Sequence, residues 1–106
     1  FPLGRHVTSV IMESDEMTAI CPVTGQPDLY RCVIGFTANK GIESKSLKLY
    51  LRSYREEGAF CEALAETILM DVVKVLEDPI EVRVSMVQKP RGGISITADA
   101  SYFRGD

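Results

Sequence analysis

The sequence predicts an α+β domain in which a four-stranded antiparallel sheet carries two helices on one face, in the order ββααββ. Three observations support this prediction. Two stretches in the first part of the chain and two in the last part alternate apolar and polar residues, as half-buried strands do. The middle of the chain repeats its apolar residues every three or four positions, which is typical of amphipathic helices. The 106 residues, 45% hydrophobic and 25% charged with a net charge of −3, have the composition of one folded domain spanning 1–106.

The first two strands are expected on either side of a loop rich in turn residues. β-Branched residues between His6 and Ile20 predict one bent strand, or two short ones around positions 13–16. A further strand is predicted from Leu29 to Thr37. The side chains that share one of its faces are those of Tyr30, Cys32, Ile34 and Phe36. Cys32 is therefore expected in the core.

Two helices are expected next, one from Glu43 to Arg55 and one from near Gly58 to Leu76, where Asp78-Pro79 ends the pattern. The apolar residues of the first are Leu47, Leu51 and Tyr54, and the stripe of the second is Phe60, Leu64, Ile68, Val72 and Val75, widened by Leu69, Val73 and Leu76. The width of that stripe predicts that the second helix is well buried.

The last two strands show the clearest alternation. Ile80, Val82, Val84 and Met86 alternate with more polar neighbours, a turn is expected over 88–93, and Ile94, Ile96 and Ala98 point inward on the final strand. A sheet of this kind has two unpaired edges and one polar face. We therefore expect copies of the chain to close them in a homo-oligomer.

The loop between the first two strands places the thiol of Cys21 and the carboxylate of Asp28 seven residues apart among prolines and a glycine. A rigid loop can hold a nucleophile and an acid in fixed relation, so Cys21 is a candidate nucleophile. The spacing alone leaves the alternatives open, a buried cysteine and an aspartate that caps a turn. Because His6 is the only histidine, the thiolate is expected to be favoured by local dipoles, backbone amides or a basic neighbour.

Composition argues against several other functions. The three cysteines contain no Cys-x-x-Cys pair, so neither a disulfide framework nor a metal site is expected. The mildly acidic balance gives no overall electrostatic reason to bind nucleic acid. No apolar run approaches the roughly 20 residues of a membrane span, so we expect a cytoplasmic protein with no membrane partner.

Four motifs occur in the order found in one family of proteins. They are Cys21-Pro-Val-Thr-Gly-Gln-Pro-Asp28, Glu43-Ser-Lys-Ser-Leu-Lys-Leu-Tyr50, Phe60-Cys-Glu62 and Pro90-Arg-Gly-Gly-Ile-Ser95. From about residue 17 to 97 the chain resembles the QueF family of tunnelling-fold (T-fold) enzymes. The resemblance implies a T-fold whose subunits form a barrel. It also implies that Cys21 attacks the nitrile carbon of a 7-cyano-7-deazaguanine group to form a thioimide, while Asp28 protonates the nitrogen.

The resemblance also implies a binding site for the base. Glu62 matches the glutamate that anchors the purine, with Cys61 beside it, although Glu62 could simply be a favourable charge in the first turn of a helix. Glu43 and Ser44 are expected to contact the base, or only to cap the first helix. A further set of residues, Lys45, Lys48 and Arg91, could meet a phosphate of a dinucleotide or of an RNA backbone, or form a solvated basic face.

Two branches of that family differ in how the thioimide is consumed. Reductases of the queuosine pathway use NADPH, and in them a histidine precedes the anchoring glutamate, where this chain has Cys61. We therefore expect the archaeosine synthase type of amidinotransferase, with ammonia as co-substrate, transfer RNA carrying the nitrile base as partner, and no cofactor. The NADPH-dependent reductase is the alternative. A non-catalytic purine or pterin binder of the same fold is the second alternative.

Overall fold

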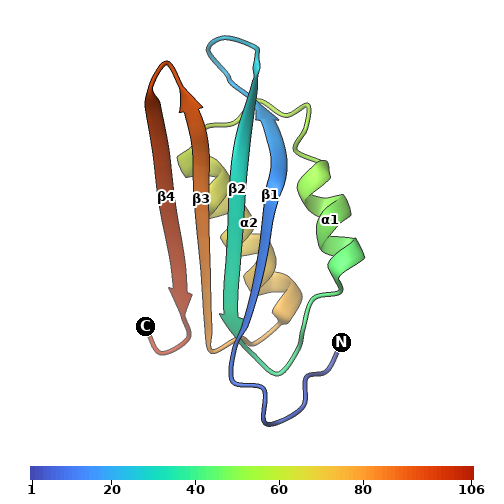
Figure 1. Cartoon of the computed structure of the whole chain (residues 1–106). Helices are drawn as coiled ribbons and strands as arrows, with labels where there is room; N and C mark the ends of the chain where they lie inside the picture. Colours follow the sequence, from blue (N-terminus) through green and yellow to red (C-terminus); the bar gives the residue numbers. More distant parts are fainter.

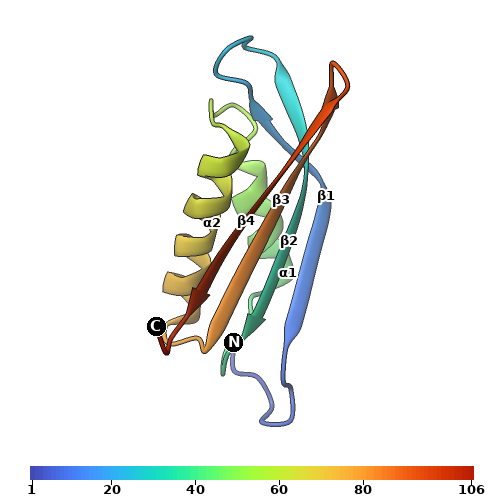
Figure 2. The same ribbon diagram turned by 90° about the vertical axis from the view of Figure 1, so that its left-hand side faces the viewer.

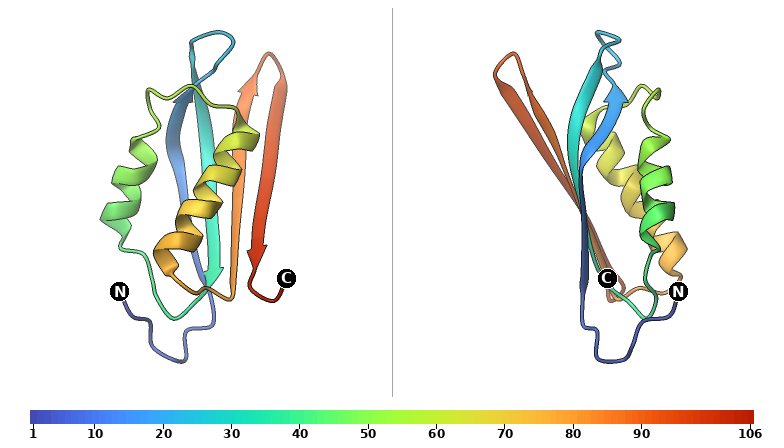
Figure 3. Two further views of the ribbon diagram at one scale, coloured as in Figure 1. Left: turned by 180° about the vertical axis from the view of Figure 1, so that it is seen from behind. Right: turned by 45° about the vertical axis from the view of Figure 1, so that its right-hand side comes forward.

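The computed structural model describes residues 1–106 and has the predicted ββααββ order. Its elements are β1 (Val10–Ile20), β2 (Pro27–Thr37), α1 (Ser44–Arg52), α2 (Cys61–Leu76), β3 (Glu81–Arg91) and β4 (Ile94–Phe103). The four strands form one antiparallel sheet in the order β1-β2-β3-β4. Both helices cover the same face of this sheet, as Figures 1 and 3 show.

The core lies between the sheet and α2, because side chains of β2 and β3 alternate between the helical face and the opposite face. The residues of β2 and β3 buried there are Tyr30, Cys32, Ile34, Phe36, Val82, Val84 and Met86. They meet Leu64, Ile68, Leu69, Val72 and Leu76 of α2. The predicted burial of Cys32 and of the second helix is confirmed. Phe60 and Val75, at the ends of the predicted stripe, are exposed.

The ends of the strands differ from the sequence-based prediction. β1 begins at Val10, four residues later than expected, and its register on β2 shifts between Ser14 and Met17, where a bend was predicted. β3 continues to Arg91, so the turn into β4 consists only of Gly92 and Gly93. Both glycines have positive φ, 67° and 83°, a backbone region that other residues rarely adopt. The β3–β4 hairpin therefore extends beyond the core.

Helix α1 buries Leu51 in the core and makes polar contacts at its start and on its side facing α2. The Glu43 side chain accepts the backbone N–H groups of Lys45 and Ser46, which caps the helix at its start. On the side facing α2, the Tyr50 hydroxyl donates to the Asp71 carboxylate over 2.5 Å. No helix in the structure is both long and apolar enough to cross a membrane.

Candidate active site

Three segments meet at one end of the sheet: the β1–β2 loop, the β3–β4 hairpin tip and the first turn of α2 (Figures 1 and 2). Backbone hydrogen bonds fix the approach to α2, because Ile20 N–H donates to Glu57 C=O over 2.8 Å and Ala59 N–H donates to Ile20 C=O over 3.1 Å. From the hairpin, Arg91 reaches across to the β1–β2 loop. Five of the residues singled out from the sequence belong to this end, namely Cys21, Asp28, Cys61, Glu62 and Arg91.

The β1–β2 loop is wound into one tight turn around Cys21. Cys21 N–H donates to Gln26 C=O over 2.8 Å, and Gly25 N–H donates to Cys21 C=O over 2.9 Å. Gly25 can close this turn because its φ is 73°. The Cys21 thiol is half-buried and not in a disulfide. The predicted alternative of a fully buried cysteine therefore does not hold for this residue.

The turn favours the thiolate form of Cys21. A hydrogen bond from the Thr24 hydroxyl lowers the pKa of Cys21 most, and the backbone N–H groups of Thr24 and Val23 lower it further. Partial burial and the charge of Asp28 act in the opposite direction but do not reverse the shift. These donors are local dipoles and backbone amides, the kind of groups that we expected to favour the thiolate because no histidine lies nearby in the sequence.

Asp28 lies inside β2 opposite Ala19, with 5% of its surface exposed, so it does not cap a turn. Its Oδ1 is 3.6 Å from Nε of Arg91. The same guanidinium donates to Oε1 of Gln26 and to the Pro27 carbonyl. Arg91 therefore connects the β3–β4 hairpin to the strand that carries the acid. The possible phosphate contact of Arg91 stays a prediction.

Tyr30 is a residue of this site that sequence reasoning placed only in the core. Its ring is buried, and its hydroxyl donates to Oε1 of Gln88 over 3.1 Å. Burial raises the pKa of Tyr30, and nearby negative charges raise it further. The groups whose charges act on it are Asp28, Cys61, Cys21 and Glu62. Tyr30 is thus a common neighbour of the predicted nucleophile, acid and base-anchoring residue.

The first turn of α2 holds Cys61 and Glu62 in different settings. The Cys61 side chain points into the core, its thiol donates to the Met86 carbonyl over 3.4 Å, and burial raises the pKa of that thiol. Glu62 is exposed at the helix start. Only Glu62 is therefore positioned to accept hydrogen bonds from a molecule in solution.

The remaining predicted residues lie at the other end of the molecule. Glu43, Ser44, Lys45 and Lys48 are at the beginning of α1, which Figure 1 places far from the β1–β2 loop. Lys45 and Lys48 are exposed, lie one helical turn apart and form no ion pair with a carboxylate. Two free ammonium groups fit the charge of a dinucleotide phosphate. A single chain does not bring them to Cys21.

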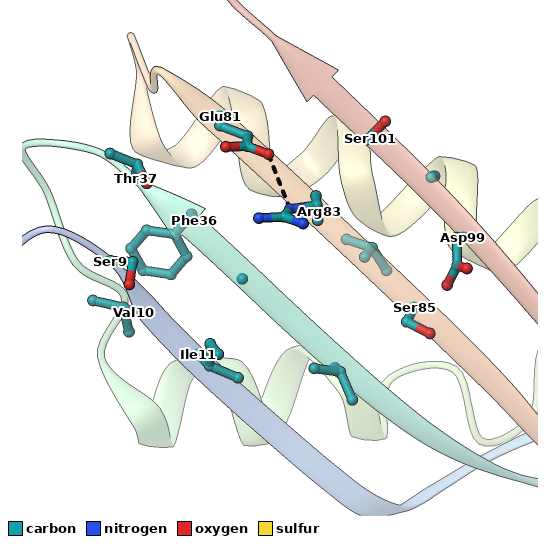
Figure 4. A pocket seen from close by; sticks show the side chains of 14 residues that line it. Ser9, Val10, Ile11, Phe36, Thr37, Glu81, Arg83, Ser85, Asp99 and Ser101 are labelled. Atoms are coloured by element: carbon teal, nitrogen blue, oxygen red, sulfur yellow. Dashed lines mark ion pairs between the residues drawn. The ribbon is translucent and has the colours of Figure 1, made fainter.

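A large hollow lies elsewhere, on the sheet face opposite the helices (Figure 4). It is open, has a volume of about 530 Å³, and none of the predicted site residues lines it. Arg83 and Glu81 form an ion pair of 2.9 Å on this surface. The size of the hollow does not make it the active site, because no cysteine lines it. No group of three or more His, Cys, Asp or Glu side chains is placed to hold a metal ion.

The fold and this end of the sheet define an α+β protein that presents a half-buried free thiol near a buried carboxylate. A family model described as "QueF-like protein" matches residues 27–105. A Syntrophus aciditrophicus protein named NADPH-dependent 7-cyano-7-deazaguanine reductase is 50% identical over 94 residues, which are 88% of this chain and 66% of that protein. A Frankia casuarinae protein of the same name is 40% identical, over 98% of this chain and 83% of its own length. The chain belongs to the QueF-like protein family.

The structure also resembles a solved one, described as the crystal structure of the archaeosine synthase QueF-Like in the apo form. The TM-score is 0.83 and the alignment covers 92% of this chain and 95% of the other, with 18% identical residues. At that identity the likeness establishes the T-fold and nothing about the reaction. The predicted fold class of the single chain is confirmed, whereas its assembly into a barrel stays a prediction.

The expectation that no cofactor is used was wrong. It rested on Cys61 in place of a histidine, yet relatives 40 to 50% identical, among them a Bacteroides fragilis protein at 46%, are named NADPH-dependent reductases. Because Cys61 is buried and its thiol is held by a core carbonyl, the residue type there says little about whether a hydride donor binds. These relatives favour the reductase alternative over the amidinotransferase.

Proposed function

We propose that this chain acts as an NADPH-dependent 7-cyano-7-deazaguanine reductase. The observation that carries the proposal is the half-buried, free thiol of Cys21, held in a tight turn just before the strand that carries the buried carboxylate of Asp28. That pair occurs in a chain 50% identical over 94 residues to a protein named as this reductase. A non-catalytic purine binder would have no use for an activated thiol next to an acid.

The residues of the loop account for the first chemical step. The Cys21 sulfur adds to the nitrile carbon, one π bond of the carbon–nitrogen triple bond breaks, and a proton reaches the nitrogen through Asp28, giving a thioimide. A soft thiolate suits this electrophile, and the carboxyl group places the proton where negative charge develops. Glu62 accepts the N–H groups of the guanine-like ring, which orients the nitrile toward the sulfur.

Reduction of the thioimide to an amine takes two hydrides and the matching protons, and NADPH would supply one hydride each time it binds. Lys45 and Lys48 would hold its phosphates, because their ammonium groups are exposed and unpaired. In the course of reduction Cys21 must leave as a thiolate. The donors from Thr24 and Val23 that stabilise that anion in the free protein stabilise the leaving group as well.

A site built this way requires a second copy of the chain. Glu43, Ser44, Lys45 and Lys48 lie at the opposite end from Cys21, so they reach substrate and cofactor only in a neighbouring subunit. The two free edges, β1 and β4, are available for such pairing. The homo-oligomer expected from the sequence is thus part of this proposal. Transfer RNA as a partner stays a prediction.

The test combines intact-mass spectrometry with a cofactor assay. The protein is incubated with 7-cyano-7-deazaguanine without NADPH, and we expect a mass increase of one nitrile molecule per chain. Cys21→Ala must lack the adduct, whereas Cys32→Ala, a matched variant at a buried thiol, must keep it. Adding NADPH is expected to consume the nitrile and release the adduct. Nitrile consumption that depends on ammonium and ignores NADPH would overturn the reductase proposal.

Sharing of the site between subunits has its own test. Cys21→Ala and the double variant Lys45→Ala/Lys48→Ala should each be inactive alone. Mixed and reassembled, they should regain part of the activity, because some interfaces then combine an intact thiol with intact lysines. No recovery in mixtures shown by mass to contain both chains would contradict a shared site.

A further inference from the structure

Gln88 lies on the helix-facing side of the sheet, next to the first turn of α2. It continues the row of β3 side chains that includes Met86, and it pairs with Tyr30 of β2 and Ile96 of β4. The Cys61 thiol donates to the Met86 carbonyl over 3.4 Å and lies 3.9 Å from the Ile96 carbonyl oxygen. These contacts hold the start of α2 against the neighbours of Gln88. Met86 is fully buried and Gln88 only half-buried, so Gln88 lies at the border of the helix.

One end of the Gln88 amide is fixed and the other is free. The Tyr30 hydroxyl donates to Oε1 of Gln88 over 3.1 Å. The Tyr30 ring is fully buried, so its hydroxyl has a fixed position and holds the amide in one orientation. Nε2 of Gln88 carries two N–H donors and makes no hydrogen bond to another protein group. The amide can therefore donate to a molecule that binds beside it.

The base of the proposed reaction needs a donor of this kind. A guanine-like ring presents two donors, the ring N–H and the exocyclic amine, and beside the ring N–H it presents a carbonyl oxygen, which accepts. Glu62 can accept from the two donors, but a carboxylate repels the carbonyl oxygen. The carbonyl therefore needs a donor of its own. The Arg91 guanidinium at this end is already engaged by the β1–β2 loop and by Asp28, whereas the Gln88 donors are unused.

We propose that Gln88 is a specificity-determining residue of the base site, that its Nε2 donates to the ring carbonyl of the base, and that Tyr30 orients its amide. The inference rests on the proposed function, because it concerns the base that the proposed reaction reduces. Glu62 and Gln88 together then match the guanine-like edge. An adenine-like ring has an amine where guanine has the carbonyl, so it would set N–H groups against N–H groups and is rejected.

The test measures binding by titration calorimetry in a Cys21→Ala chain, in which the thioimide cannot form. The two ligands are 7-cyano-7-deazaguanine and its 6-thio analogue, in which sulfur, a weaker acceptor, replaces the carbonyl oxygen and the ring N–H is kept. The Cys21→Ala chain should bind the carbonyl form about five times more tightly than the thio form. Adding Gln88→Leu should weaken binding of the carbonyl form about tenfold and bring the two affinities within about twofold of each other.

Two further variants in the same chain separate recognition from folding. Tyr30→Phe keeps the ring and removes the hydroxyl, so it should lower the preference for the carbonyl form without abolishing binding. Val87→Ala changes the residue before Gln88, whose side chain lies on the opposite face of the sheet, and should leave the preference unchanged. A merely structural role of Gln88 would weaken both ligands equally in Gln88→Leu. Such an unchanged ratio would overturn the inference.

The outcomes distinguish this inference from the proposed function. If the Cys21→Ala chain binds neither ligand, the base is not its substrate and both proposals fail. If it binds the base and Gln88→Leu has no effect on either affinity, the proposed function stands and only the role of Gln88 is refuted. The carbonyl would then be met by the backbone N–H groups at the start of α2, which no side chain caps.

Discussion

Arg91→Met offers the sharpest test of how the two hairpins at the active end are held together. The guanidinium contributes an ion pair of 3.6 Å to Asp28 and hydrogen bonds to Gln26 and Pro27. At 3.6 Å the attraction is about 1.2 kcal/mol at the dielectric constant of water and about 4.6 kcal/mol at an effective value of 20. Because Asp28 is 5% exposed and Arg91 45%, we expect the substitution to cost about 1–3 kcal/mol of unfolding free energy.

Arg83→Met is the matched control. Arg83 pairs with Glu81 over 2.9 Å, a shorter distance than that of Arg91, but 72% of the Arg83 side chain is exposed. Solvent screening should reduce the cost there to below about 0.5 kcal/mol. If distance rather than burial of the carboxylate decided the energy, Arg83→Met would be the more damaging change. The two variants therefore distinguish the two explanations.

The assay is urea denaturation at neutral pH and one fixed protein concentration, since association would shift the apparent stability. A double-mutant cycle with Asp28→Asn isolates the pair, and we expect a coupling energy of about 1 kcal/mol or more between Arg91 and Asp28. Equal costs for Arg91→Met and Arg83→Met, together with a coupling below about 0.3 kcal/mol, would refute the reasoning.

Two further predictions concern the thiols and the contact between the helices. At about pH 8, iodoacetamide should modify Cys21 but not Cys32 in the native chain, because burial raises the pKa of Cys32 to about 12. Modification of Cys32 without denaturant, detected by mass spectrometry, would contradict this prediction. Tyr50→Phe removes the hydrogen bond to Asp71 and should cost about 1 kcal/mol, with faster amide exchange in α1. The control is Tyr102→Phe, because the Tyr102 hydroxyl makes no hydrogen bond to another protein group. This substitution should leave the unfolding free energy and amide exchange in α1 unchanged.

The alternation of apolar and polar residues predicted the middle of each strand correctly but not where the strands end, and Pro90 shows why. Proline cannot donate to a neighbouring strand, so the sequence placed it in a turn. In the structure, pairing of β3 with β2 ends at Gln88, opposite Tyr30. Beyond that point β3 has only β4 beside it, with a register shift between Gln88 and Arg91. A strand with one neighbour tolerates proline, and no local pattern reveals where the other neighbour stops.

The same limit applies to the site. Cys21 and Asp28 lie within one loop and the strand after it, so their proximity was predictable from spacing. Arg91 is 63 residues after Asp28 in the sequence, and only the stagger of the two hairpins brings them together. The hydrogen bond from Tyr30 to Gln88 likewise depends on the β2–β3 register. Sequence patterns set which face a side chain occupies, whereas such cross-strand contacts depend on a register fixed by the whole sheet.

The two arguments made from missing histidines had opposite outcomes, for a physical reason. At Cys21 the argument concerned a requirement: an anion needs donors, so without a histidine the loop had to supply them, and its Val23 and Thr24 do so. At Cys61 the argument inferred the reaction type from one residue that differs between two branches of the family. That side chain is buried against Met86, and relatives close in sequence are named reductases. A physical requirement, such as hydrogen-bond donors for a thiolate, is therefore a firmer basis for prediction than the residue type found at one family position.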